Sequence, residues 1–173
     1  EKEAMDFKKE TEKITREVIE ESKEQGWPLR TGSVYIEYEA RINDNKTMSI
    51  SVTYYQYTGG AHGNSYKKTV NLDLVNEKEL LLNEFFADSD AYKKVLTDEL
   101  LKQMTNDKDD LFAEALEDFK ASDDLKFYLT DEAIVFYFNP YEIAPYAKGI
   151  VEYKVPYDAL KDILNKNYAQ RFL

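Results

Sequence analysis

The sequence predicts a single α+β domain in which an antiparallel sheet carries helices packed on one face. Three observations lead to this fold class: a helical apolar stripe near the N-terminus, a switch to period-two alternation, and a return of helical spacing before two late strands. The 173 residues suit one domain. Because no internal repeat or low-complexity linker interrupts them, one compact unit is expected.

The first predicted element is an amphipathic helix over residues 4–25. Its apolar positions Phe7, Ile14 and Val18 are seven and four residues apart, which places them on one helical face. Gly26 and Pro28 follow, and this order is typical of a helix C-terminus. The helix is therefore expected to end at residue 25.

A hairpin of two alternating strands is predicted next, with one face toward the core and one face toward water. Asn43, Asp44 and Asn45 supply the turn between the strands, and a third strand is expected at residues 66–74. The residues expected to face the core are Val34, Ile36, Tyr38, Ala40 and Ile42 in the first strand, and Met48, Ile50, Val52 and Tyr54 in the second.

Helical spacing returns in the second half of the chain. Asp88 or Ser89 can cap a helix that runs through Met104, and a further helix is expected over residues 111–119. Two strands at 127–129 and 133–138, a strand at 150–155 with Val151, Tyr153 and Val155 inward, and a last helix at 157–168 complete the prediction.

The charge of the chain is strongly acidic, with 34 Asp and Glu against 23 Lys and Arg and a net charge of -11. Such a surface repels a phosphate backbone, so nucleic acid is excluded as a partner. Residues 76–124 hold 15 acidic and 6 basic side chains and so carry most of the excess. This face either attracts a cationic partner or only keeps the protein in solution, and the sequence leaves both readings open.

Several kinds of chemistry lack the residues that they need. There is no cysteine and His62 is the single histidine, which rules out disulfides, thiolate metal sites and multi-histidine metal sites. No apolar run has the length of a membrane helix, so no membrane contact by this fragment is expected, and any signal or anchor would lie upstream of Glu1. We expect no cofactor, no metal and no enzymatic activity.

A glycine-rich segment at residues 57–63 is a first candidate contact loop, through Gly59, Gly60 and His62. A catalytic histidine would need a positioned nucleophile, and the sequence has no Gly-x-Ser-x-Gly elbow. Catalysis is therefore the least favoured of three readings of His62. The other two are a structural histidine that bonds to the loop backbone and a residue that touches a partner.

A second candidate is the connection at residues 141–149, which lies between two predicted strands. Pro140 and Pro145 restrict its backbone, and this reduces the entropy that docking would cost. The predicted partner-binding residues are Tyr141, Glu142, Pro145 and Tyr146. The alternative is that Tyr141 and Ile143 only cover a sheet edge.

Residues 57–63, 71–73, 80–86, 141–149 and 156–157 together resemble the extracytoplasmic domain of RsiV-type anti-sigma factors. The same segments are similar to the module preceding the catalytic domain of PdaC-type peptidoglycan deacetylases, and to stand-alone secreted proteins of Gram-positive bacteria. The resemblance divides the chain into an N-terminal helix and hairpin at 1–56 and an RsiV-like domain at 57–173.

The resemblance implies a non-catalytic binding or sensor domain of the cell envelope, outside the cell or tethered to its surface. Its expected partner is lysozyme or another cationic wall-active protein, with the loop around Pro145 as the contact. An alternative is a peptidoglycan-binding accessory module, in which Tyr55, Tyr57 and Tyr66 would stack on sugar rings.

Overall fold

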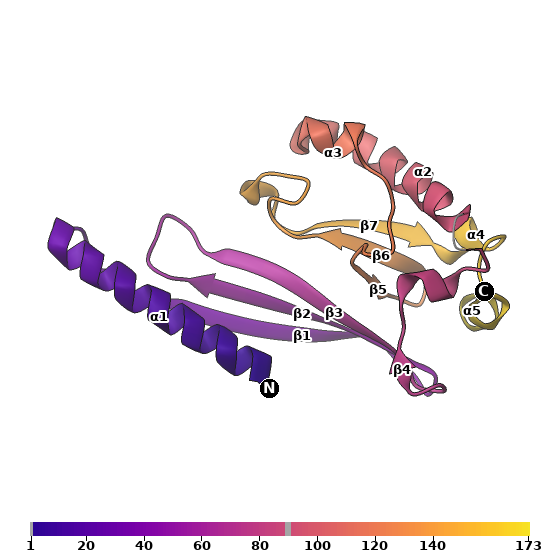
Figure 1. Cartoon of the computed structure of the whole chain (residues 1–173), viewed down its shortest axis with the longest axis horizontal. Helices are drawn as coiled ribbons and strands as arrows, with labels where there is room; N and C mark the ends of the chain where they lie inside the picture. The colour runs from indigo at the N-terminus through magenta and orange to yellow at the C-terminus, as the bar shows by residue number, and fades with distance from the viewer. Residues whose placement is uncertain (1, 89–90) are drawn as a thin grey trace. The chain divides into compact units, whose positions relative to one another are not determined.

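The computed structural model describes residues 2–88 and 91–173 and confirms the α+β class. Its strands are divided between two antiparallel sheets, with strand orders β1-β2-β3-β4 and β5-β6-β7 (Figure 1). In chain order the elements are α1 (Lys2–Gln25), β1 (Ser33–Asn43), β2 (Thr47–Tyr57), β3 (Asn64–Asp73), β4 (Lys78–Glu79), η1 (Leu82–Phe85), α2 (Ala91–Asn106), η2 (Lys108–Asp110), α3 (Ala113–Glu117), β5 (Phe127–Leu129), β6 (Ala133–Phe138), η3 (Tyr146–Lys148), β7 (Val151–Pro156), α4 (Tyr157–Leu160) and α5 (Lys166–Phe172).

The chain forms two compact units. The first holds the chain up to Tyr38 together with Val52–Lys67, and the second holds Glu39–Ser51 together with the chain from Lys68 onward. The division after residue 56 that the sequence suggested stays a prediction. No helix in the described part of the chain combines the length and the apolar character needed to cross a membrane.

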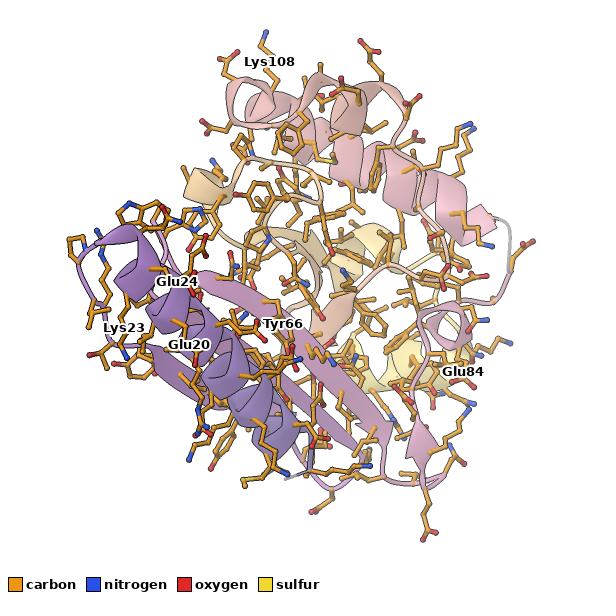
Figure 2. All side chains as sticks on the ribbon, turned by 60° about the vertical axis from the view of Figure 1, so that its left-hand side comes forward. Glu20, Lys23, Glu24, Tyr66, Glu84 and Lys108 are labelled. Atoms are coloured by element: carbon orange, nitrogen blue, oxygen red, sulfur yellow. The ribbon has the colours of Figure 1, made fainter. Side chains whose placement is uncertain are left out.

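The first unit is organised around Phe7 on α1. Its ring lies 5.3 Å from Tyr54 and 5.6 Å from Tyr66, edge-on to both, and the two tyrosine rings stack at 4.8 Å. Figure 2 labels Tyr66 beside this helix. As predicted, α1 ends before Gly26, which adopts a φ of 71° that favours glycine.

The second unit has its core between α2 and the sheet β5-β6-β7. The buried residues of α2 follow one another at intervals of four, which puts them on one face, and this face packs near β7. Val151, Tyr153 and Val155 of β7 are buried, as the alternation predicted. The buried residues of α2 are Tyr92, Leu96, Leu100 and Met104.

The start of α2 agrees with one of the two predicted caps. The Asp88 carboxylate accepts a hydrogen bond from the backbone N–H of Ala91 at 3.1 Å. The other predicted cap, Ser89, lies outside the described residues.

The predicted core face of the hairpin is wrong over much of its length. In β2 it is the polar residues Thr47, Ser49 and Ser51 that are buried, whereas Met48 and Ile50 are only half-buried. In β1, Tyr38 is 80 % exposed against the prediction, whereas Ile42 is buried as predicted. The buried and open faces are therefore exchanged over residues 47–51 of β2, whereas Tyr54, further along the strand, is buried as predicted.

A backbone edge in the second unit explains the exchange. Strand β5 presents unpaired backbone groups, and side chains pair with them: Leu129 N–H donates to Ser49 Oγ at 2.9 Å, and Asn71 Nδ2 donates to Phe127 O at 3.0 Å. Ser49 Oγ in turn donates to Asn71 Oδ1 at 2.7 Å. Because buried backbone groups must be hydrogen-bonded, polar side chains are needed on this face of the strands.

Two predicted helices are shorter than expected. The stripe at 111–119 contains only the five-residue α3, with Phe112 36 % exposed, and the last helix is divided into α4 and α5. The last helix is interrupted by contacts with a distant segment. Asn165 N–H donates to Phe85 O at 2.7 Å, and Leu164 forms an isolated antiparallel β-bridge with Phe86. These backbone bonds take residues 161–165 out of the helical path.

A buried carboxylate joins α5 to β3 within the second unit. Asp73 accepts hydrogen bonds from Arg171 Nη2 at 3.2 Å, from Tyr168 Oη at 3.3 Å and from the backbone of Asn76 at 3.1 Å. Burial alone would raise the pKa of Asp73, but the hydrogen bonds from Asn76 and Arg171 outweigh it and lower the pKa to about 2. Asp73 is therefore a charged anchor for the C-terminal helix.

Candidate partner-binding loop

The connection between β6 and β7 is anchored at its centre and exposed at its flanks. Ile143 and Ala144 are buried, at 6 % and 2 % exposure, whereas Tyr141 is 59 % exposed and Pro145 is also exposed. The apolar pair therefore fixes the loop to the core of the second unit, while the neighbouring ring and proline face solvent. The alternative prediction was that Tyr141 and Ile143 only cover a sheet edge. Ile143 is buried, which agrees with it, whereas Tyr141 is exposed, which does not.

Tyr141 adopts an unusual backbone conformation, with φ at 71°. A bulky side chain rarely occupies this left-handed region, because its Cβ crowds the backbone. Hydrogen bonds maintain the conformation: Tyr141 N–H donates to Ala144 O at 3.0 Å and Glu142 N–H donates to Asn139 O at 3.0 Å. Strain of this kind collects at functional sites, where it holds a side chain in a set orientation.

The two tyrosines of the loop form one aromatic surface. The ring centroids of Tyr141 and Tyr146 lie 5.9 Å apart at an interplanar angle of 31°. Tyr146 is half-buried at the start of η3, next to Pro145. The structure thus brings the rings of Tyr141 and Tyr146 together, with Pro145 next to Tyr146 in the chain.

Glu142, the fourth predicted contact residue, serves the loop itself. Its Oε2 accepts a hydrogen bond from Asn139 N–H at 2.9 Å, and its Oε1 forms an ion pair with Lys126. Because both carboxylate oxygens are engaged inside the unit, Glu142 positions the loop. Its direct contact with a partner stays a prediction.

An acidic segment, residues 107–118, is bonded directly to this loop. Phe112 N–H donates to Ile143 O at 2.9 Å, and Lys148 Nζ lies 2.6 Å from Asp110 Oδ2. This hydrogen bond with Asp110 raises the pKa of Lys148. The segment contains six carboxylates and one lysine, a net charge of -5, and all but Asp107 of these acidic residues are exposed. An aromatic surface and a negative field therefore occur side by side.

The glycine-rich segment lies in the first unit and is bonded to itself. Gly60 O accepts hydrogen bonds from Tyr57 Oη at 3.0 Å and Arg30 Nη1 at 2.9 Å, and Gly59 has a φ of 99°. His62 is exposed, with Nδ1 2.8 Å from Gly63 O, so that Nδ1 carries a proton in this contact. The structural reading of His62 is supported, and the contact role of Gly59, Gly60 and His62 stays a prediction.

Sequence reasoning missed the residues that support the loop, above all Lys126, Asp110 and Phe112. Lys126 and Asp110 each form one ion pair with the loop, and the sequence offers many other acids and lysines as partners. Phe112 contributes a backbone N–H, which no sequence pattern marks. The dipeptide Asn139-Pro140 was the one local signal for the start of the loop, because asparagine before proline favours a turn.

The described residues hold no group of three or more His, Cys, Asp and Glu side chains that could bind a metal ion. In the loop itself, Tyr141, Glu142, Pro145 and Tyr146 include no activated nucleophile beside a base, the arrangement that covalent catalysis needs.

Comparison with solved structures places this architecture among known proteins. A structure of a DUF3298 family member from Bacteroides fragilis NCTC 9343 is 31 % identical, with a TM-score of 0.69, over 95 % of this chain and 67 % of that one. The chain belongs to the DUF3298 family. A DUF3298 family protein from Pseudomonas aeruginosa PAO1 is 25 % identical, with a TM-score of 0.61, over 79 % of this chain and 63 % of the other.

Family models agree with this membership. The DUF3298 model, described as a protein of unknown function, matches residues 83–158, which include the whole candidate loop, and the model named deacetylase PdaC matches residues 1–65.

Two curated relatives come from Bacillus subtilis strain 168. The peptidoglycan-N-acetylmuramic acid deacetylase PdaC is 27 % identical over 99 % of this chain and 36 % of its own length. The anti-sigma-V factor RsiV is 29 % identical over 91 % of this chain and 57 % of its own length. The predicted resemblance to RsiV-type and PdaC-type proteins is thus confirmed, although this DUF3298 chain spans only about a third to just over half of these relatives.

Proposed function

We propose that this chain is a non-catalytic binding or sensor domain of the cell envelope that recognises lysozyme or another cationic cell-wall-active protein. The observation that carries the proposal is the pair of exposed residues Tyr141 and Pro145 with the half-buried Tyr146 ring, bonded to an acidic segment of net charge -5. Relationship to an anti-sigma factor and to a peptidoglycan deacetylase supports a role at the cell envelope.

The two features would contribute to different steps of binding. The negative field of residues 107–118 raises the association rate of a basic protein and weakens as salt screens it. Burial of Pro145 and of the tyrosine rings sets the dissociation rate, because aromatic side chains in a stiff loop lose little entropy on docking. The chain would act outside the cell, free or tethered through an upstream segment.

Isothermal titration calorimetry of the chain with hen lysozyme, at low and at moderate salt, tests the proposal. We expect saturable heat at both salt concentrations, with weaker affinity at the higher one. Cytochrome c, a cationic protein without cell-wall activity, is the matched control and should bind far more weakly. Absence of heat with lysozyme, or equal binding of both proteins, would contradict the proposal.

A second candidate function, a peptidoglycan-binding accessory module, is favoured by exposed aromatic residues of the first unit. Tyr38 is 80 % exposed and Tyr35 is 61 % exposed, as rings that stack on sugars would be. The three tyrosines that the sequence predicted for sugar stacking are less suitable, because each is engaged within the unit. The Tyr66 ring stacks on Tyr54, the Tyr57 hydroxyl donates to Gly60 O, and the Tyr55 ring lies against Gly63.

Co-sedimentation with purified peptidoglycan separates the two functions. The module function predicts that Tyr35→Ala and Tyr38→Ala reduce sedimentation, whereas Tyr141→Ala leaves it unchanged. Lysozyme recognition predicts that, in calorimetry, Tyr141→Ala weakens lysozyme binding, whereas Tyr35→Ala and Tyr38→Ala leave it unchanged. In either case His62→Ala should leave muramidase and esterase assays of the chain unchanged, because we propose that His62 performs no chemistry.

A further inference from the structure

A cleft in the first unit, between α1 and the extended segment 29–34, takes no part in the function proposed above. Its volume is about 560 Å³, within the range of roughly 300 to 1,000 Å³ that small-molecule sites occupy. Every residue that lines it belongs to the first unit. The cleft is therefore a property of that unit alone.

The two walls of the cleft are amphipathic. From α1 come residues spaced three, four, seven and eight apart, which is one helical face, and Ile19 is the apolar member of this face. From segment 29–34 come Leu29 and Val34, and Leu29 remains 58 % exposed. A large aliphatic side chain that is left open at the rim of a cleft gains free energy when a ligand covers it.

The two walls of the cleft meet at a glycine, Gly32. A Cβ atom on Gly32 would lie 2.5 Å from Thr15 Oγ1, closer than such atoms approach, and 3.1 Å from the backbone oxygen of Tyr57, which is a tight contact. Gly32 thus lets the extended segment touch α1 at this point. Thr11 and Thr15 are short side chains, so the face of the helix above this contact stays open.

The charge of the cleft is opposite to that of the chain. Lys8, Arg16 and Arg30 line it against a single acid, Glu12, in a protein of net charge -11. Lys8 Nζ lies 3.8 Å from Glu12 Oε1, so these two charges offset one another. The two guanidinium groups form no ion pair with any other described residue.

Arg30 is already positioned for an anion. Its Nη1 donates to Tyr57 Oη at 3.2 Å and to Gly60 O at 2.9 Å, which fixes the plane of the guanidinium. Its Nε and Nη2 donors bond to none of the residues that the structure describes. A guanidinium with its plane fixed and two donors available is suited to a carboxylate or a phosphate group.

We infer that this cleft binds a small organic anion, with its carboxylate or phosphate group between Arg16 and Arg30 and its aliphatic or aromatic body against Ile19, Leu29 and Val34. Two cationic groups combined with an apolar wall select a ligand that carries both features. Neither an uncharged apolar molecule nor a bare inorganic anion uses the whole site.

Nuclear magnetic resonance titration of the full chain tests the inference with three matched probes: 4-phenylbutyrate, 4-phenylbutyl phosphate and the uncharged 4-phenylbutan-1-ol. We expect saturable shifts of backbone amides at residues 8–19 and 29–34 with one or both anions, with a dissociation constant of about 1 mM or lower. The two anions distinguish carboxylate from phosphate. The alcohol should bind at least about tenfold more weakly, because charge-assisted hydrogen bonds are lost.

Substitutions of the two arginines test whether they bind the anionic group of the ligand. Arg16→Gln should weaken binding of the anion at least about fivefold and leave the alcohol unaffected. Lys23→Gln is the matched control, since Lys23 is an exposed cation on the same helix outside the cleft, labelled with Glu20 and Glu24 in Figure 2. Arg30→Gln should act like Arg16→Gln, and amide dispersion verifies that the unit is still folded.

Each result decides the inference. Saturable shifts confined to the cleft and lost in Arg16→Gln support it. Shifts scattered over the chain, equal binding of the alcohol, no effect of Arg16→Gln, or an equal effect of Lys23→Gln overturn it. None of these results depends on lysozyme recognition, which is measured in the other unit.

Discussion

Lys148 Nζ lies 2.6 Å from Asp110 Oδ2, and this pair connects the aromatic loop to the acidic segment in the second unit. Both side chains are at the surface, so the pair itself stabilises the fold little. Its consequence is geometric: together with the bond from Phe112 N–H to Ile143 O, it keeps carboxylates next to Tyr141 and Tyr146.

Contact through the loop should matter more for affinity than the charge of α3. We expect Pro145→Ala combined with Tyr146→Ala to weaken lysozyme binding at least about tenfold, because these residues would fill the buried centre of the proposed contact. Glu114→Gln combined with Glu117→Gln, which are exposed on α3, should cost about threefold or less, mainly in association rate. Calorimetry and surface plasmon resonance measure both. Equal losses would argue against a loop-centred contact.

Backbone strain at Tyr141 separates stability from binding. At a φ of 71° glycine is unstrained, so Tyr141→Gly should be about 1 kcal/mol more stable to unfolding than Tyr141→Ala. Both variants remove the ring and should weaken lysozyme binding alike. Urea unfolding and calorimetry on the same two proteins check this. If the glycine variant were the less stable one, the conformation at residue 141 would not be strained.

Protonation of Asp73 in acid should destabilise the attachment of the C-terminal helix α5. Because hydrogen bonds overcome burial and lower the folded pKa to about 2 from 3.8, the charged form stabilises the protein above pH 4, and this stabilisation is lost as pH falls toward 2. The expected loss is about 2 kcal/mol. Asp73→Asn should be less stable than wild type at pH 7, with the difference shrinking below pH 4.

Urea unfolding between pH 7 and pH 2 measures the effect. Asp162→Asn, at an exposed carboxylate of the same unit, is the control and should follow wild type throughout. A constant difference between Asp73→Asn and wild type across this range would mean that the carboxylate is not a charged anchor.

Close packing of Tyr55 against Gly63 predicts a pair of alanine variants with different outcomes. A Cβ on Gly63 would lie 2.3 Å from the Tyr55 hydroxyl oxygen and 2.4 Å from the ring, so Gly63→Ala should destabilise the protein by about 1 to 3 kcal/mol. Gly60→Ala, where nothing lies within 4 Å, should be nearly neutral. Thermal unfolding of both variants would detect the difference, and equal melting temperatures would refute the close contact.

Elements with strong local signals were predicted well. The bounds of α1 follow from the spacing of Phe7, Ile14 and Val18 and from Gly26, and the burial of Val151, Tyr153 and Val155 follows from their alternation. Tyr141 and Pro145 of the candidate loop are exposed, and the sequence had marked both, because a stiff, aromatic connection between two strands is suited to contact. These features depend on neighbours in the chain, which a sequence displays.

Features that depend on distant backbone groups were not predictable. Ser49 and Asn71 are buried because they bond to the edge of β5, about 55 to 80 residues further along the chain. Residues 161–165 leave the helix for the same kind of reason, through Phe85 and Phe86.

The α+β class, the first helix, the late strands, the acidic charge and the stiff connection between β6 and β7 follow from the order of the residues. The buried face of β2, the left-handed conformation of Tyr141 and the cationic cleft at Gly32 arise only in the folded chain. Periodicity and turn chemistry act over a few residues, whereas a buried polar group or a charge meets its partner only when distant segments come together.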